Sequence, residues 1–238
     1  MTGTFINVGT VLLGTLIGSL LGNRLPERFQ QRVLFGLGMV VLVLGVDDAL
    51  AWRDTNPLYV IGGVLLGGLA GEALRIEDRL DGLGQRLQRR FAKGNPTHPS
   101  EHSIAEGFFT ASLLFCVGPL AVLGAIQDGL SGDYQTLATK ALLDGFAAIA
   151  LASGLGFGVG FSALSILVYQ GAITLGAGLF TDILAKGSDA LASLTSAGGI
   201  LIIGIALKLL DIRDVKVGNY LPALVVAPCL VGIVSLVR

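Results

Sequence analysis

The chain of 238 residues is 53% hydrophobic and 14% charged, and its mean hydropathy is +0.76. Soluble domains carry about 25% charged residues, so this composition excludes a soluble globular protein and indicates a chain embedded in a lipid bilayer. The formal net charge of -1 excludes a basic surface for nucleic acid.

Apolar stretches long enough for the roughly 20 residues that cross a hydrocarbon core recur along the whole chain. No basic residue precedes the first stretch, so we expect a retained helix and not a cleavable signal. Hydropathy, with breaks at charges and prolines, predicts an all-α polytopic membrane protein, a single domain of about eight transmembrane helices. The predicted spans lie near residues 5–22, 33–50, 58–74, 104–126, 140–156, 162–184, 197–210 and 219–237.

The charges of the loops predict the orientation. With the N-terminus outside, the inner loops hold twelve of the sixteen basic residues, and the outer loops 47–56 and 127–139 are acidic on balance. The positive-inside rule therefore predicts eight spans in a bacterial cytoplasmic (inner) membrane, with both termini outside. The glycine-rich stretch 153–160 leaves open whether the fifth and sixth spans form one broken hairpin.

Glycines recur at intervals of four in the first and third predicted helices. They are Gly14, Gly18 and Gly22 in the first helix and Gly63, Gly67 and Gly71 in the third. Such stripes let two helix backbones approach closely in a membrane, so we expect the first and third helices to pack on each other. Small-residue stripes that remain exposed also fit a homodimer.

Residues 36–57 resemble residues 198–222. Each stretch has a glycine pair, an apolar run, an acidic loop, and then an asparagine and a proline. The two stretches run in opposite directions in the predicted topology, which is typical of the inverted repeats of secondary transporters. Chance similarity between apolar segments is the alternative interpretation.

The segment 75–93, between the third and fourth spans, combines an apolar stripe with basic residues at helical spacing. This pattern predicts a cytoplasmic amphipathic helix that lies on the bilayer and binds anionic lipid, or equally a cytoplasmic extension packed on its own protein. The lipid-binding residues would be Arg79, Arg86, Arg89 and Arg90. His98, Glu101 and His102 follow, and we interpret them as part of a solvated loop and not as a metal site.

The fourth predicted helix contains a break. Pro119 cannot donate a hydrogen bond to the carbonyl of Phe115, and Gly118 loosens the same turn, so we expect a carbonyl that is free to bind a ligand, or a simple proline kink. Ser112 and Cys116 lie four residues apart on one face of this helix. Both cysteines of the chain fall in apolar runs, which is typical of small buried side chains and not of a disulfide framework.

Other polar side chains fall inside predicted spans, where they must face protein or a wet cavity. Gln170 and Thr174 lie on one face of the sixth helix, and we interpret Gln170 either as a binding residue or as a partner in an interhelical hydrogen bond. Asp144 in the fifth helix is a candidate for binding a cation or a proton, or for an ion pair with Lys140. Glu72 is a candidate for the same roles, but its spacing of three residues from Arg75 favours a structural ion pair.

Two asparagines, Asn7 and Asn219, stand at the predicted starts of the first and last helices. We interpret them as helix caps, although asparagines at corresponding helix ends can also line a shared cavity.

These residues suggest a secondary transporter or permease for an unidentified small solute or ion. The predicted substrate- or ion-binding residues are Gln170, Thr174, Asp144, Ser112, Phe115, Cys116 and Gly118, and we expect them to converge on one polar cavity. A non-transporting membrane scaffold or interaction protein is the alternative. We expect no enzyme, no cofactor and no metal, because the spans carry no HExxH or GxSxG motif and no nucleotide-binding loop.

Several motifs resemble a known family. They are FFTASLLFCVGPLAVLGAIQDGL at 108–130, KALLDGFAAIALASGLGFGVGFSAL at 140–164, YQGAITL at 169–175, GGILIIGIALKLL at 198–210 and KVGNYLPAL at 216–224. The chain resembles, over nearly its whole length, the bacterial membrane family called domain of unknown function 554, the YqgA/YdfK-like proteins. The resemblance implies a small multi-spanning inner-membrane protein and carries over no activity, substrate or catalytic residue.

Overall fold

The computed structural model describes residues 1–22, 26–79, 104–116, 119–180 and 187–237, and these residues form helices and connecting turns without a strand. The predicted all-α class is therefore confirmed. The α-helices are α1 (Thr2–Gly22), α2 (Glu27–Ala49), α3 (Pro57–Leu74), α5 (Ile104–Cys116), α6 (Pro119–Ser131), α7 (Gln135–Leu155), α8 (Ser162–Leu175), α9 (Ala177–Phe180), α10 (Asp189–Leu209) and α11 (Ala223–Val237). The 3-10 helices are η1 (Leu50–Asp54), η2 (Gly156–Phe161) and η3 (Val217–Tyr220).

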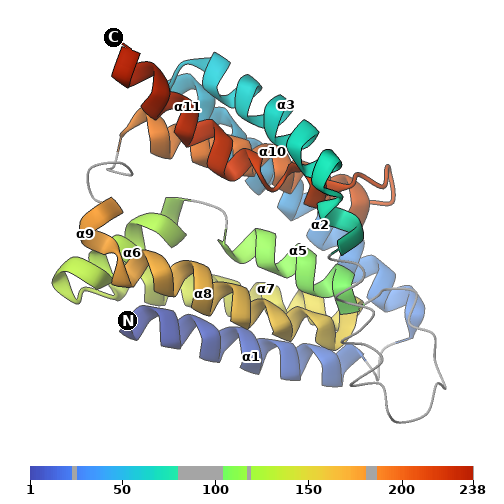
Figure 1. Ribbon diagram of the computed structural model, residues 1–238. Helices are drawn as coiled ribbons and strands as arrows, with labels where there is room; N and C mark the ends of the chain where they lie inside the picture. Colours follow the sequence, from blue (N-terminus) through green and yellow to red (C-terminus); the bar gives the residue numbers. More distant parts are fainter. Residues whose placement is uncertain (23–25, 80–103, 117–118, 181–186, 238) are drawn as a thin grey trace.

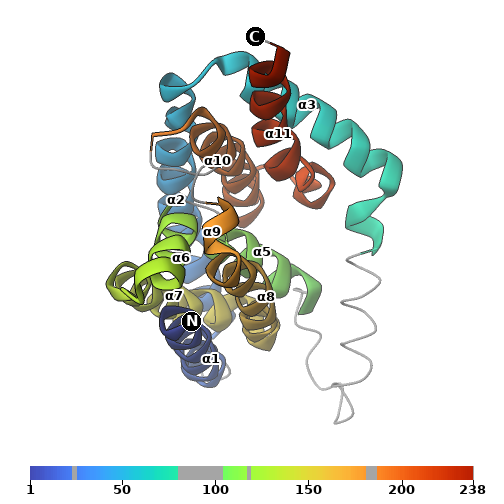
Figure 2. The ribbon, with the colours of Figure 1, turned by 60° about the vertical axis from the view of Figure 1, so that its left-hand side comes forward.

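The helices are arranged in two layers that lie side by side (Figures 1 and 2). We call α1 and α5 to α9 layer A, and α2, α3, α10 and α11 layer B. Within layer A the most extensive contact is between α1 and α7, and within layer B it is between α2 and α10, followed by α3 and α11. Contacts of α2 with α7 and of α10 with α5 join the layers.

Glycine stripes hold the closest helix pairs together, but their partners differ from the sequence prediction. A methyl group at Gly18 would overlap the backbone oxygen of Ile149 in α7, and one at Gly67 would overlap the backbone of Ala223 in α11. The prediction that the first and third helices pack on each other is therefore wrong. Both stripes are buried within one chain, so they give no support for a homodimer.

The contact register gives the relative directions of the helices. Gly14 lies against Gly145 and Gly22 lies against Ser153, so α1 and α7 run parallel. In three other pairs, later residues of one helix contact earlier residues of its partner, so the two helices are antiparallel. These pairs are α1 with α8, α2 with α10 and α3 with α11. The chain between α7 and α8 therefore reverses its direction at η2.

The polarity of the helix faces is the reverse of that in a soluble bundle. The buried face of α1 carries glycines, threonines and Asn7, whereas its exposed face carries Leu12, Leu13, Leu16 and Leu20. The buried face of α3 carries three glycines, and its exposed face is also rich in leucine. Leucine faces lipid and small residues face neighbouring helices when the surrounding solvent is a bilayer.

Five stretches of the described chain are long and apolar enough to cross a membrane, or six if α5 and α6, which meet at a bend of 63°, form one span. One of the five is Gln135–Leu175, which contains both α7 and α8. The predicted number of eight spans stays a prediction.

Some helix boundaries differ from the predicted ones. The seventh predicted span began at residue 197, but α10 begins at Asp189, where the side chain of Ser188 accepts a hydrogen bond from the backbone N–H of Leu191. Hydropathy missed these turns because they contain an acid and several hydroxyl side chains. Residues 80–93 of the predicted amphipathic segment, and His98, Glu101 and His102, lie outside the described residues.

Candidate functional site

Five polar side chains from three helices meet inside layer A. We call them the polar cluster: Thr4 and Asn7 of α1, Asp144 of α7, and Gln170 and Thr174 of α8. All five are buried, and Asn7 and Thr4 are 0% exposed. The parallel packing of α1 on α7 and the antiparallel packing of α1 on α8 bring them together.

Hydrogen bonds connect the polar cluster through Asn7. The Nδ2 group of Asn7 donates to Oδ2 of Asp144 at 3.0 Å and to Oε1 of Gln170 at 3.1 Å. The Nε2 group of Gln170 donates to Oγ1 of Thr4 at 3.3 Å, and the Thr4 and Thr174 hydroxyl oxygens are 3.4 Å apart. The Thr174 hydroxyl donates to the carbonyl oxygen of Gln170 at 2.9 Å, which fixes its orientation.

The cluster contains one carboxylate, and one ammonium group faces it. Nζ of Lys140 pairs with Oδ2 of Asp144, and both side chains are buried. This is the ion pair that the four-residue spacing predicted. A pair of this kind loses its hydration in the interior, so its net contribution to stability is small or unfavourable.

One polar atom of the cluster has no hydrogen-bond partner. Oδ1 of Asn7 is fully buried and accepts no bond, although Nδ2 of the same amide donates twice. An unsatisfied buried acceptor costs about 1–3 kcal/mol unless a water molecule or a ligand occupies the space beside it. The cluster therefore offers an acceptor to a ligand.

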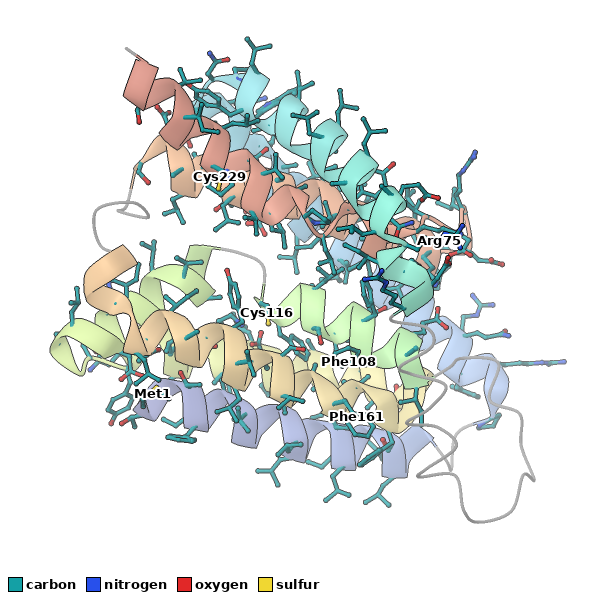
Figure 3. All side chains as sticks on the ribbon, viewed as in Figure 1. Met1, Arg75, Phe108, Cys116, Phe161 and Cys229 are labelled. Atoms are coloured by element: carbon teal, nitrogen blue, oxygen red, sulfur yellow. The ribbon has the colours of Figure 1, made fainter. Side chains whose placement is uncertain are left out.

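A cavity of about 320 Å³ lies between the two layers, and we call it the interlayer pocket. Helix α5 and α8 of layer A and α10 of layer B line it, together with the chain around the start of α11. Its polar lining side chains are Ser112, Cys116, Ser165, Tyr169 and Thr195, and the remainder are apolar. Figure 3 shows Cys116 at the end of α5, between the two layers.

The lining of the interlayer pocket determines which ligands it can take. No charged side chain of the described residues lines it. The hydroxyl of Ser112 donates to Ser165 at 2.9 Å, which uses one of the few polar groups for a contact between α5 and α8. A charged ligand would lose its hydration here without gaining a partner, so the lining favours a neutral, largely apolar molecule.

The structure places the predicted site residues in two locations. Gln170, Thr174 and Asp144 belong to the polar cluster, whereas Ser112 and Cys116 line the interlayer pocket. The expectation that all of them line one polar cavity is therefore wrong, because Ser112 and Cys116 face the pocket between the layers. Asp144, Gln170 and Thr174 instead bond to residues of α1. Phe115 is 1% exposed and packs in the apolar core of layer A. Gly118 lies outside the described residues.

Sequence reasoning missed the central residue of the cluster. Asn7 was interpreted as a helix cap, or as lining a cavity shared with Asn219, but α1 begins at Thr2, so this asparagine lies inside the helix. Its position was nevertheless indicated by the pattern, since Asn7, Gly14 and Gly18 recur on one helical face. Thr4 was missed as well.

The second asparagine that was interpreted as a cap also has another role. Asn219 lies in η3, where its Nδ2 group donates to Oε2 of Glu72 at 2.6 Å and its Oδ1 accepts from the backbone N–H of Glu77 at 2.8 Å. It therefore holds the end of α3 against the start of α11. Within the described part of the chain, no group of three His, Cys, Asp or Glu side chains can hold a metal ion.

Helices with leucine outside and glycine inside define a polytopic α-helical membrane protein. The chain belongs to the family described as "Protein of unknown function (DUF554)", which matches residues 2–232. It is 32% identical to the "Uncharacterized membrane protein YdfK" of Bacillus subtilis (strain 168), over 98% of this chain and 97% of that protein. It is 30% identical to the "Uncharacterized protein YqgA" of Escherichia coli (strain K12), over 94% of each chain. No solved structure matches the chain.

Proposed function

We propose that this protein is a secondary transporter for a small solute or an ion, that it catalyses no covalent chemistry, and that the interlayer pocket is its solute site. The observation that carries the proposal is the position of this pocket, between two layers and beside the bend that joins α5 to α6. A site that opens alternately to the two sides of a membrane requires a cavity between two bodies that can move relative to each other.

The helix pairing supports the proposal. The pairs α1 with α8, α2 with α10 and α3 with α11 are each antiparallel and in contact. A twofold axis in the membrane plane would relate α1 to α8, α2 to α10 and α3 to α11, and the two sets of helices follow the same order along the chain. Such an arrangement is typical of an inverted repeat, and the second and third pairs contain the similar residues 36–57 and 198–222.

The polar cluster supports the same proposal. A buried carboxylate inside a membrane protein is expensive and typically marks an ion or proton pathway. Helix α8 connects the two places, because Gln170 belongs to the cluster whereas Ser165 and Tyr169 of the same helix line the pocket. Movement of α8 would therefore affect both places.

We also propose that the protein lies in the inner membrane with both termini outside. Single cysteines introduced by Asp133→Cys and Asp214→Cys, in a Cys116→Ser, Cys229→Ser background, report the topology, since both aspartates are exposed. An impermeant maleimide added to intact cells should label the first variant only. Labelling of the second variant from outside would contradict this orientation.

Alternating access can be tested without knowledge of the substrate. In a Cys229→Ser variant, Cys116 is the remaining cysteine, and it lines the pocket. An impermeant thiol reagent should modify Cys116 both in right-side-out and in inside-out vesicles, because a transporter opens the pocket to each side in turn. The alternative, a non-transporting scaffold, predicts modification from one side at most, and that result would overturn the proposal.

A further inference from the structure

We infer that the polar cluster binds a monovalent alkali cation, and that this cation and the Lys140 ammonium exclude each other at Asp144. The inference rests on the proposed transporter function, because it assigns the coupling ion of that transporter. It depends on three observations: the orphaned acceptor on Asn7, the oxygen-rich composition of the cluster, and the single carboxylate that it contains.

The orphaned acceptor points to a missing partner. Oδ1 of Asn7 is buried and accepts no hydrogen bond, while the Nδ2 group of the same amide is committed to Asp144 and Gln170. Because both donor contacts hold the amide in this orientation, the oxygen cannot turn away to find another donor. A group that binds Oδ1 must be a hydrogen-bond donor or a cation.

The neighbouring atoms favour a hard cation. Besides Oδ1 of Asn7, the cluster holds side-chain oxygens of Asp144, Gln170, Thr4 and Thr174, which hydrogen bonds connect to the Nδ2 side of the same amide. Amide, hydroxyl and carboxylate oxygens are the ligands that alkali and alkaline-earth cations prefer over softer metals. The cluster contains no histidine and no cysteine, which soft metals prefer.

The charge of the cluster selects a monovalent cation. Asp144 is its single carboxylate, and buried charge must be neutralised locally. A divalent cation would leave one charge uncompensated, whereas one alkali cation would be balanced. The Lys140 ammonium already provides that balancing charge, so cation binding requires Lys140 to leave Asp144.

The inference is tested by the thermal stability of the purified full-length protein in detergent. Choline chloride is replaced by lithium, sodium or potassium chloride at constant ionic strength. A ligand that binds the folded state raises the melting temperature with its concentration. We expect a saturable rise for at least one alkali cation in the wild-type protein, and none from choline.

Variants locate the effect. Asn7→Leu removes the orphaned acceptor and Asp144→Asn removes the charge, so the cation-dependent rise should disappear in both. Lys140→Met removes the competing ammonium, so the same rise should occur at a lower cation concentration than in the wild-type protein. Asp48→Asn in layer B is the matched control and should keep the wild-type response.

Several outcomes would overturn the inference. They are the absence of any alkali-specific rise in both the wild-type protein and Lys140→Met, or a rise that persists in Asn7→Leu. If Asp144→Asn does not fold, Asn7→Leu and Lys140→Met still decide the question, because they are predicted to shift the response in opposite directions. Cation binding in detergent does not require transport. A negative result in this experiment therefore differs from a negative result for the transporter proposal, which is the modification of Cys116 from one side of the membrane at most.

Discussion

Layers A and B are assembled in the same way but differ in the bonding of their buried polar side chains. In layer A, described side chains bond to one another across three helices, from Thr4 to Asp144. In layer B, buried hydroxyls bond to backbone carbonyls, as Ser193 does to Ala190 and Ser196 does to Ala49, and the amide of Asn219 bonds to the exposed Glu72 at the end of α3. Glycine contacts hold both layers together. Layer B therefore shows that this kind of packing does not require a buried ion pair, which is why we assign the cluster of layer A a function.

The buried pair of Lys140 and Asp144 in layer A provides the strongest test of this difference. Lys140→Met should destabilise the protein by about 3–5 kcal/mol in choline chloride, because it leaves the buried Asp144 carboxylate without its partner. Lys140→Met combined with Asp144→Leu should recover most of that loss, because it removes both charges. The free energy of unfolding, measured by denaturation in mixed detergent micelles, checks both expectations. Equal stability of the single and double variants would show that the pair is not buried as the structure indicates.

The glycine contacts provide the next largest effect, and it should be the same in both layers. Gly18→Leu in α1 and Gly67→Leu in α3 should each destabilise by about 1–3 kcal/mol, because the new side chain overlaps the backbone of the neighbouring helix. Gly9→Leu is the matched control in α1, since no atom lies near the position of its Cβ. Thermal unfolding in detergent measures the three variants. A large loss at one position and none at the other would contradict the common mode of assembly.

The sequence predicted the helices better than their partners. Hydropathy and glycine spacing identified the membrane class and the interacting faces of α1 and α3, because both properties depend on local composition. A glycine stripe defines a face and not the helix that packs on it, so the contacts of α1 with α7 and of α3 with α11 could not be predicted. Those contacts depend on the topology of the whole chain.

The candidate site was predicted in part for the same reason. Gln170, Thr174 and Asp144 stood out because polar side chains are rare inside apolar spans. Their separation from Ser112 and Cys116 depends on which face of each helix meets the other layer. Asn7 was missed because residues near the start of an apolar segment resemble helix caps when the true start of the helix is unknown.

A smaller loss of stability is expected when a hydroxyl group outside the polar cluster is removed, and this loss should leave the proposed functions intact. Ser196→Ala in α10 removes a hydrogen bond of 2.8 Å to the carbonyl oxygen of Ala49 and should cost about 0.5–1.5 kcal/mol. It should leave both the alkali-cation response and the labelling of Cys116 unchanged, because Ser196 belongs to neither the cluster nor the pocket. Thermal unfolding and the labelling rate measure the two properties. A change in the cation response would mean that layer B shares the function that we assign to layer A.

The smallest expected effect concerns the contact between the layers. Nζ of Lys208 in α10 lies 3.7 Å from Oε1 of Glu106 in α5 and 3.4 Å from Oδ1 of Asp214, and its side chain is partly exposed. Exposed ion pairs contribute about 0–1 kcal/mol, so Lys208→Met should barely change the melting temperature. The contact with Glu106 joins layer A to layer B, so its removal should still change how often the layers separate.

The labelling rate of Cys116 is the measurement that detects this change. In the Cys229→Ser background, Lys208→Met should speed the modification of Cys116. Added salt should speed the same reaction in the protein that keeps Lys208, because salt screens the attraction between Lys208 and Glu106. Asp214→Asn is the control, since it removes the carboxylate that lies beside Lys208 but keeps the contact of Lys208 with Glu106 between the layers. If all three proteins react at one rate and salt has no effect, the ion pair does not restrain the layers.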